Sequence, residues 1–297
     1  MAETLVRVGE HTLTLTNLDK VLYPEVGFTK GEVIDYYARI APVLLTHCAA
    51  RCVTFRRFPD GVDHEGFFEK RCPKHRPEWV PVAVGPGDRN GEVAYCLLEE
   101  PAAVVWAANL AALELHTPMA RTDDLDSPQM VVFDLDPGPR TDIADCARVA
   151  LELRELVGTL GLELYAKTSG SKGMQLYLPL NSPHTHEHCS DFALAAAQVL
   201  ERRDPERITT TMAKAQRHGR VFIDWSQNSR HKTTICAYSL RARSTPTVST
   251  PVSWEEVADT AAGMPLSFEA AEVVARVEEL GDLFAPTATV VQSLPTG

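Results

Sequence analysis

The sequence has no long apolar run, and this absence limits the class of protein that it can encode. Without a stretch of about 18 apolar residues, no transmembrane helix is expected. Residues 1–7 lack the apolar core of a signal peptide, so no leader is expected either. The 7 cysteines are an odd, scattered set, which favours reduced thiols over a disulfide framework. Together these features predict a cytoplasmic protein with no membrane partner.

Positive charge is also in short supply, because 29 Lys and Arg face 40 Asp and Glu for a net charge of −11. This balance argues against a generic nucleic-acid binder, since attraction to phosphates requires a basic surface. The deficit is uneven, however. Residues 200–245 hold ten basic and four acidic side chains, giving +6, whereas residues 252–297 hold one arginine and eight acids, giving −7. We therefore expect weak non-specific DNA binding, with recognition of a particular end or gap.

Two aspartates one residue apart are the most informative feature that is present. Four apolar residues from Met130 lead into Asp134 and Asp136, and Pro137 and Gly138 then end the run. This pattern predicts a buried strand on which both carboxylates project from the same face. Two adjacent carboxylates repel each other unless a cation lies between them, which predicts a site for Mg²⁺ or Mn²⁺. The simpler alternative is an acidic turn after a strand.

A glycine-rich segment, Lys167 to Gly173, separates two further strand-like runs at residues 162–166 and 174–178. Its two glycines allow backbone N–H groups to converge on an anion, and two lysines and three hydroxyl groups accompany them. These are the groups that bind a triphosphate, although the spacing of a Walker A loop is absent. A polar hairpin that binds nothing is the alternative.

A third acid, Asp224, ends another apolar strand pattern that begins at Val221. If this strand pairs beside the first, Asp224 becomes a third metal ligand, and two ions roughly 3.5–4 Å apart could be held. Otherwise Asp224 caps a turn at the end of its strand.

At this point the chain resembles a known family through seven ordered motifs. These motifs are Leu13–Pro24, Gly66–Lys70, Leu113–His116, Phe133–Pro137, Thr168–Gly173, Ile223–Asn228 and Tyr238–Arg243. The family is the archaeo-eukaryotic primase superfamily, and the similarity is strongest to the polymerase domain of bacterial ligase D and its stand-alone relatives. The resemblance covers nearly the whole chain and implies template-directed nucleotidyl transfer, with ribonucleotides preferred, at short gaps or broken ends during non-homologous end joining or gap repair.

The resemblance also implies roles for individual residues. Catalysis and binding of two Mn²⁺ or Mg²⁺ ions would fall to Asp134, Asp136 and Asp224. The nucleoside triphosphate would be bound by His116, Ser169, Lys172, Gly173, Gln175, Arg241 and Arg243. DNA would contact Asn17, Lys20, Lys30, Arg56, Phe67 and Phe68, of which the first three would hold a 5′-phosphate and the phenylalanines would stack on a base. The implied partners are DNA with a gap, overhang or 5′-phosphate end, a Ku-type end-binding protein and a separate ligase.

One position departs from the family pattern. Where relatives usually carry histidine two residues after the second glycine of the loop, this chain has Gln175. Glutamine can donate an amide hydrogen bond but cannot become cationic, so nucleotide affinity or its pH dependence should differ from that of relatives.

Several of these residues also have a simpler interpretation. His116 could be an ordinary packed histidine, and Arg241 and Arg243, on one strand face, could form a solvated basic edge. Because Phe67 and Phe68 are adjacent on a strand, their side chains face opposite ways and at least one should belong to the core.

A basic hairpin loop is expected at Ala215–Arg220, just before the third aspartate. Its Arg217 and Arg220 are candidates to contact a primer end, or the loop is an exposed turn with ordinary charges. Cys48, Cys52, Cys72 and His75 have a spacing that only approximates a zinc site, so packed thiols and a surface histidine are expected.

Element patterns predict an α/β (α+β) chain with a mixed central sheet that carries the Asp-x-Asp strand and is flanked by helices. Helices are expected from the capping box Thr29–Glu32, over 101–112, 142–160 and 186–203, and from the capping box Ser253–Glu256. Further strands are expected at 52–55, 66–69, 93–98, 209–212, 221–224 and 233–239. We expect one catalytic domain over residues 1–297, with a DNA-binding part (about 1–125), a catalytic sheet (126–250) and C-terminal helices (251–297).

Two rival functions remain at this stage. Phe133-Asp-x-Asp after an apolar strand also opens phosphohydrolases of the haloacid dehalogenase type, in which the first aspartate is a nucleophile. That fold usually continues with Asp-Gly-Thr, whereas Pro137 and Gly138 follow here. A DNA-end-binding module with a decayed site is the non-enzymatic rival, motivated by Gln175, and retention of all three aspartates speaks against it.

Overall fold

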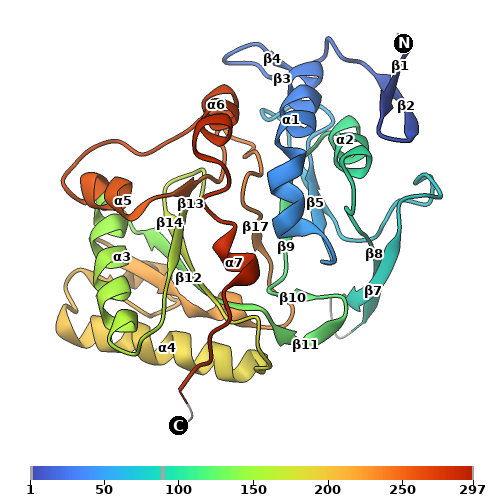
Figure 1. Ribbon diagram of the computed structural model, residues 1–297. Helices are drawn as coiled ribbons and strands as arrows, with labels where there is room; N and C mark the ends of the chain where they lie inside the picture. The colour runs from blue at the N-terminus through green and yellow to red at the C-terminus, as the bar shows by residue number, and fades with distance from the viewer. Residues whose placement is uncertain (1–2, 88–90, 296–297) are drawn as a thin grey trace. The chain divides into compact units, whose positions relative to one another are not determined.

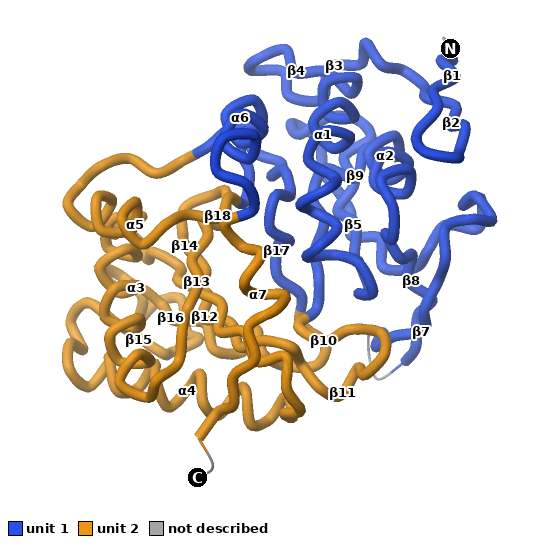
Figure 2. The backbone as a smooth tube through the Cα atoms, in the orientation of Figure 1, with its two compact units in different colours: residues 1–118, 233–249, 268–282 blue, residues 119–232, 250–267, 283–297 orange. Residues whose placement is uncertain are grey.

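The computed structural model describes residues 3–87 and 91–295, and in this part the chain forms two compact units, each built from segments that are distant in sequence (Figure 2). The first unit comprises residues 1–118, 233–249 and 268–282, and the second comprises residues 119–232, 250–267 and 283–297. The expectation of one catalytic domain in three consecutive parts stays a prediction.

The first unit is built around an antiparallel sheet in the order β17-β9-β5-β6. These strands span Thr234–Ile235, Ala112–Thr117, Thr54–Arg57 and Phe67–Glu69. Smaller pairs are formed by β1 (Glu3–Val8) with β2 (His11–Thr16), β3 (Val21–Tyr23) with β4 (Phe28–Thr29), and β7 (Val82–Pro86) with β8 (Glu92–Cys96).

The described residues of this unit form the helices α1 (Lys30–Cys48), α2 (Pro101–Asn109) and α6 (Ala270–Leu280). Helix α1 begins at the predicted capping box, in which the Thr29 side chain accepts from the backbone N–H of Glu32. Its apolar face is buried and includes Val33, Tyr37 and Leu44, and α1 packs against both α2 and α6.

The second unit is organised by a mixed six-stranded sheet in the order β15-β16-β12-β14-β13-β18, of which β12, β13 and β14 are labelled in Figure 1. The strands span Ile208–Thr209, Val221–Asp224, Met130–Pro137, Met174–Pro179, Tyr165–Thr168 and Pro251–Val252. Only the β15–β16 pair is parallel. The predicted mixed sheet with a central Asp-x-Asp strand is therefore confirmed.

Helices α3 (Ile143–Gly158) and α4 (His186–Arg203) pack against β12 in this unit. Phe133 on β12 meets Phe192 of α4 edge to face, and Cys146 of α3 donates to the Leu135 carbonyl. Because side chains alternate along a strand, Asp134 and Asp136 project from the opposite face of β12. Helices α3 and α4 thus form a core with the Phe133 face of β12, and Asp134 and Asp136 lie on the face turned away from these helices.

The remaining elements of this unit are short. They are β10 (Ala120–Arg121), β11 (Asp124–Pro128), the 3₁₀ helices η2 (Lys214–Gln216) and η3 (Trp225–Asn228), α5 (Trp254–Ala261) and α7 (Pro286–Thr289). Helix α5 starts at the predicted capping box formed by Ser253 and Glu256. In the described part of the chain, no helix has the length and apolar character that crossing a bilayer requires.

Two sequence expectations were wrong, one about the segment before Asp224 and one about the strand expected over 233–239. The segment before Asp224 is not a hairpin loop, because β15 and β16 run parallel and residues 210–220 cross from one strand to the next. The strand expected over 233–239 shortens to Thr234–Ile235, because Tyr238 takes a left-handed backbone with φ of 66° that ends the extended run.

Cys72 and Cys96 form a disulfide, which corrects the expectation that all thiols are reduced. The backbone N–H of Cys72 donates to the Ala94 carbonyl of β8, which brings the two Cα atoms to 4.8 Å. Cys72 therefore cannot serve as a free zinc ligand, while Cys48 and Cys52 are buried free thiols as expected.

Candidate active site

Strand pairing in the second unit brings the three predicted acids together. In the antiparallel register of β12 with β16, Asp134 lies directly opposite Asp224, and Asp136 lies two residues further along the same face of β12. The strand pairing on which a third ligand at Asp224 depends is therefore present. A one-residue slip would move Asp224 to the other face, so the register itself assembles the cluster.

The electrostatics of this acid cluster reflect crowding of like charges. Burial, together with the charges of Asp136 and Asp224, raises the pKa of Asp134 to about 7 against the opposing hydrogen bond from Gln175. Asp224 accepts hydrogen bonds from the backbone N–H of Ser226 at 3.0 Å and from the Ser226 hydroxyl at 2.6 Å. A cation beside these oxygens would relieve the repulsion that the pKa of Asp134 records.

Amide groups hold the carboxylate oxygens in place. Gln175 donates to Asp134 Oδ1 at 3.1 Å, and Gln227 donates to Asp224 Oδ2 at 3.0 Å and to Asp134 Oδ2 at 3.5 Å. Among residues 3–87 and 91–295, no group of three or more His, Cys, Asp or Glu side chains is placed so that it could hold a metal ion as it stands. The hard oxygen donors and their mutual repulsion nevertheless fit a divalent cation.

The predicted glycine-rich loop is a tight turn between β13 and β14. The Ser169 hydroxyl oxygen accepts from the backbone N–H of Gly173 at 3.1 Å and of Ser171 at 3.3 Å. Gly170 has a φ of 63°, a left-handed conformation that favours glycine. Lys172 is exposed on this turn, so its ammonium group is available to an anion in solution.

Glycine is required at the end of this turn by a close approach to the catalytic strand. A Cβ at Gly173 would lie 2.2 Å from the Leu135 carbonyl oxygen, which is backbone and cannot rotate away. The loop is therefore fixed against the strand that carries Asp134 and Asp136. Lys167, the other lysine of the motif, is fully buried instead of lining the turn.

The predicted basic segment packs on the residues that follow the Asp-x-Asp strand. Gly138 donates to the Arg220 carbonyl at 2.9 Å, and a Cβ at Gly138 would lie 1.8 Å from the Arg217 carbonyl oxygen. The Arg217 guanidinium stacks on the Phe222 ring with its Cζ 3.6 Å from the centroid. Structural contacts therefore occupy part of Arg217, and contact of either arginine with DNA stays a prediction.

A second polar cluster lies in the first unit and centres on Glu114, a residue that sequence reasoning missed. Its carboxylate is almost fully buried on β9 and accepts from His116 Nε2 at 3.0 Å, from Arg241 Nε at 3.2 Å and from the Ala242 backbone N–H at 3.0 Å. Arg56 approaches both of its oxygens at 3.4 Å. A charged residue between Leu113 and Leu115 in a buried strand was the available signal.

The charges in this Glu114 cluster offset one another. Burial opposes ionisation of Glu114, but the hydrogen bond from His116 and the Arg241 charge outweigh it and hold the Glu114 pKa below the usual range. Burial lowers the pKa of His116, although Glu114 opposes that shift. The Glu114 carboxylate thus holds the His116 ring in place. Arg241 follows an isolated β-bridge at Leu240 and does not lie on a basic strand edge.

Both predicted stacking residues are exposed, which corrects the expectation that one belongs to the core. Phe67 is 45% exposed and Phe68 is 60% exposed on β6. The register of β5 with β6 places Arg57 opposite Phe67 and Arg56 opposite Phe68, and each guanidinium lies over its ring at 5.4 and 5.3 Å from the centroid. The Phe68 ring also meets the His116 ring edge to face, with 5.5 Å between the centroids. Stacking of either phenylalanine on a base stays a prediction.

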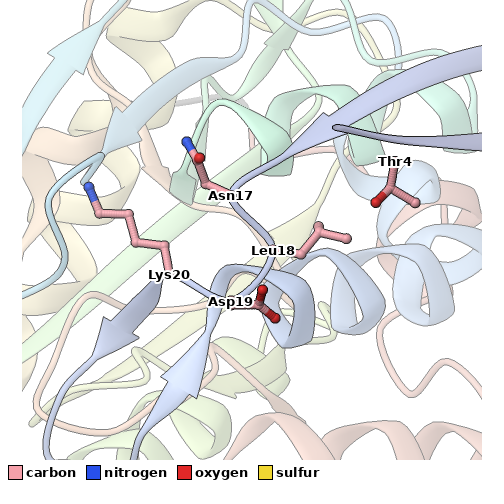
Figure 3. Close-up of a pocket in the computed structure, with 5 residues that line it drawn as sticks. All are labelled: Thr4, Asn17, Leu18, Asp19 and Lys20. Atoms are coloured by element: carbon pink, nitrogen blue, oxygen red, sulfur yellow. The ribbon is translucent and has the colours of Figure 1, made fainter. Parts of the chain in front are cut away.

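A cavity of about 640 Å³ lies beside the predicted 5′-phosphate residues. Its lining includes Asn17, Asp19 and Lys20, whose side chains appear in Figure 3. Lys20 also pairs with Asp60 at 3.0 Å. Lys30 is buried next to this segment, because its backbone N–H donates to the Lys20 carbonyl and its ammonium donates to the Thr16 carbonyl at 2.6 Å.

Comparison with known proteins identifies the family. Residues 29–284 match the family model of the LigD primase-polymerase domain. The chain is 44% identical over 274 residues to the multifunctional non-homologous end joining protein LigD of Mycolicibacterium smegmatis, covering 92% of this chain and 35% of that protein. It is 33% identical over 270 residues to the bifunctional LigD of Bacillus subtilis, covering 91% of this chain and 43% of that protein.

A solved structure agrees with this assignment. The polymerase domain of Mycobacterium tuberculosis ligase D, determined in complex with DNA, superposes with a TM-score of 0.88 at 40% identity and covers 94% of this chain and 99% of that chain. The chain spans 35–43% of the length of these curated relatives. The expected family, fold class and enzyme class are confirmed, and the phosphohydrolase alternative is not favoured. The chain belongs to the LigD primase-polymerase domain family.

Proposed function

We propose that this chain is a DNA-dependent nucleotidyltransferase that adds nucleotides, with ribonucleotides preferred, at gaps or broken ends during non-homologous end joining. The observation that carries the proposal is the pairing of Asp134 with Asp224, with Asp136 on the same face. Three carboxylates on adjacent strands suit phosphoryl transfer, in which charge must be neutralised on both the attacking and the leaving oxygens.

The acid cluster would hold two Mn²⁺ or Mg²⁺ ions through Asp134, Asp136 and Asp224. When bound, such ions lower the pKa of an attacking 3′-hydroxyl and neutralise the departing pyrophosphate. The chain's own part is to fix the carboxylate oxygens, and Ser226 and Gln227 do this for Asp224 through hydrogen bonds of 2.6 and 3.0 Å. Positioned ligands of this kind lose little entropy when the substrate arrives.

The glycine-rich turn of the second unit and, taken separately, the arginines of the Glu114 cluster in the first unit are each candidates to bind phosphate. Ser169, Lys172 and Gly173 offer a hydroxyl, an exposed ammonium and a fixed backbone on one turn. Arg241 is oriented by Glu114, and Arg243 is exposed two residues further along. Because Glu114 already neutralises part of the local charge, these arginines can be held close together before a phosphate binds.

DNA would contact the first unit through its exposed aromatic pair and its 5′-phosphate residues. Phe67 and Phe68 would stack on a base, and Asn17, Lys20 and Lys30 would hold a 5′-phosphate. The solved relative was determined with DNA, which supports this proposal. A Ku-type end-binding protein and a ligase activity are the further partners that we propose, and a repair role would place the protein with the chromosome in the cytoplasm.

Primer extension across a short gap with a downstream 5′-phosphate tests this function. Wild-type protein with Mn²⁺ should extend the primer, and faster with ribonucleotides than with deoxynucleotides. The Asp134→Ala variant should give no product while it still binds the gapped DNA, since its DNA contacts are unchanged. Absence of wild-type extension with retained DNA binding would refute catalysis and favour the end-binding module.

A further inference from the structure

Four polar residues form one continuous row across the catalytic sheet of the second unit. Asp224 lies opposite Asp134, Asp134 lies opposite Gln175, and Gln175 lies opposite Lys167, so the row crosses β16, β12, β14 and β13. In a sheet, residues in register on neighbouring strands project to the same face and are close enough to interact. The row therefore joins the acid cluster to a buried ammonium group.

Hydrogen bonds connect three of these four residues, from Lys167 through Gln175 to Asp134. Lys167 Nζ donates to Gln175 Oε1 at 2.6 Å, and Gln175 Nε2 donates to Asp134 Oδ1 at 3.1 Å. A lysine ammonium can only donate, so it fixes the amide oxygen on its own side and directs the amide nitrogen to the carboxylate. The Tyr177 hydroxyl also reaches Gln175 Oε1 at 3.4 Å.

Burial makes this arrangement energetically significant. Lys167 is fully buried and Gln175 is 4% exposed, so neither group can exchange its partner for bulk water at low cost. Inside a low-dielectric sheet, consecutive hydrogen bonds polarise one another, and the ammonium strengthens the donation from the amide to Asp134. Both ends of the Gln175 amide are thus engaged within the sheet.

We propose that Lys167 and Gln175 are positioning residues that fix the orientation of the Asp134 carboxylate for divalent-cation binding. This inference rests on the proposed metal-dependent function. It gives Gln175 a different part from the direct nucleotide contact expected at its position in the loop motif. Lys167 acts through Gln175, and Gln175 acts through Asp134, in the manner of groups that orient metal ligands from behind.

Mn²⁺ binding in the absence of nucleotide tests this inference by isothermal titration calorimetry. Gln175→Met and Lys167→Met remove the hydrogen bonds while they preserve side-chain length. Each should raise the Mn²⁺ dissociation constant about 10-fold or more, the usual effect of losing such a partner. The double variant should lose little more affinity than Gln175→Met alone, because the hydrogen bond of Lys167 reaches Asp134 through the amide.

Nucleotide KM at saturating Mn²⁺ separates positioning from direct contact. We expect it to stay within about twofold of wild type in both variants, since the defect lies in the metal site. A raised nucleotide KM with wild-type Mn²⁺ affinity would overturn the inference and assign Gln175 to the nucleotide. Wild-type values of both quantities would overturn it as well.

Three controls keep the test decisive. Tyr177→Phe removes only the longer contact to Gln175 and should leave Mn²⁺ affinity near wild type. If thermal melting shows that Gln175→Met does not fold, Gln175→Asn retains the amide but shortens its reach, and wild-type Mn²⁺ affinity in that variant would overturn the inference. Asp134→Ala should abolish the tight Mn²⁺ site. Wild-type Mn²⁺ affinity in Asp134→Ala would overturn the proposed metal site itself. Wild-type Mn²⁺ affinity in the Gln175 and Lys167 variants, with loss of the site in Asp134→Ala, would overturn the positioning roles alone.

Discussion

Raising the pH from 7 to 9 should weaken binding of a DNA 5′-phosphate through deprotonation of Lys30. This lysine is only 6% exposed, and its ammonium donates to the Thr16 carbonyl and hydroxyl at 2.6 and 3.3 Å. Burial, together with the charges of Lys20 and Arg57, lowers its pKa to about 8. Lys30 is therefore a phosphate-binding candidate that changes charge within an accessible pH range.

The magnitude follows from that pKa. With a pKa of about 8, about nine-tenths of Lys30 is charged at pH 7 and about one-tenth at pH 9. A phosphate favours the charged form, so the affinity is full below the pKa and falls about tenfold by pH 9. The lowered pKa of Lys30 also makes the free energy of unfolding depend on pH. Because the folded state binds the Lys30 proton less tightly than the unfolded state does, this residue makes stability rise as pH increases above about 8.

Fluorescence anisotropy with gapped DNA measures this effect, using matched substrates with and without the downstream 5′-phosphate. The affinity advantage conferred by the phosphate should shrink about tenfold from pH 7 to pH 9 in the wild type. Lys30→Arg should bind with an advantage that is constant over this range, because guanidinium stays charged. A constant advantage in the wild type, or the same loss in Lys30→Arg, would refute the reasoning.

Two further predictions concern packing and buried charge. Gly173→Ala should destabilise the protein by about 1–3 kcal/mol in urea denaturation, because its Cβ would meet the Leu135 carbonyl, whereas Gly158→Ala, which meets nothing within 4 Å, should not; equal midpoints would contradict this. Glu114→Gln should cost about 3–5 kcal/mol at pH 7, because Arg241 loses its buried carboxylate. The Glu114 pKa is lowered in the folded state, so its contribution to the free energy of unfolding is present at neutral pH and lost in acid. If the cost of Glu114→Gln stays constant as pH falls through the ordinary glutamate range, this prediction is wrong.

Local patterns predicted the acid cluster well because its geometry depends on strand periodicity. Alternation placed Asp134 and Asp136 on one face, and the apolar run before Asp224 identified the neighbouring strand. The capping boxes at Thr29 and Ser253 also began helices where expected. In each case the residues that decide the structure are adjacent in sequence, so single-sequence reasoning had access to the relevant interactions.

Long-range contacts account for what the sequence could not predict. The buried position of Glu114 depends on contacts with Arg56 of β5 and with Arg241, which follows Leu240. These residues are distant in sequence, so no local pattern predicts the contacts. Lys167 belongs to a loop motif that suggests exposure, yet the row across β14 buries it against Gln175. Cys72 pairs with Cys96 because a backbone hydrogen bond to β8 aligns them, which cysteine spacing does not encode.

The strand order of the catalytic sheet has a consequence for protein synthesis. Strand β12 is made early and gains β14 on one side soon afterwards, but its other edge remains open until β16 leaves the ribosome. An open, apolar edge can pair with other chains, so a ribosome that stalls before Val221 would release an aggregation-prone product. Such a product would also lack Asp224. Pairing of β16 with β12 therefore closes the exposed edge and brings the three aspartates together in the same step.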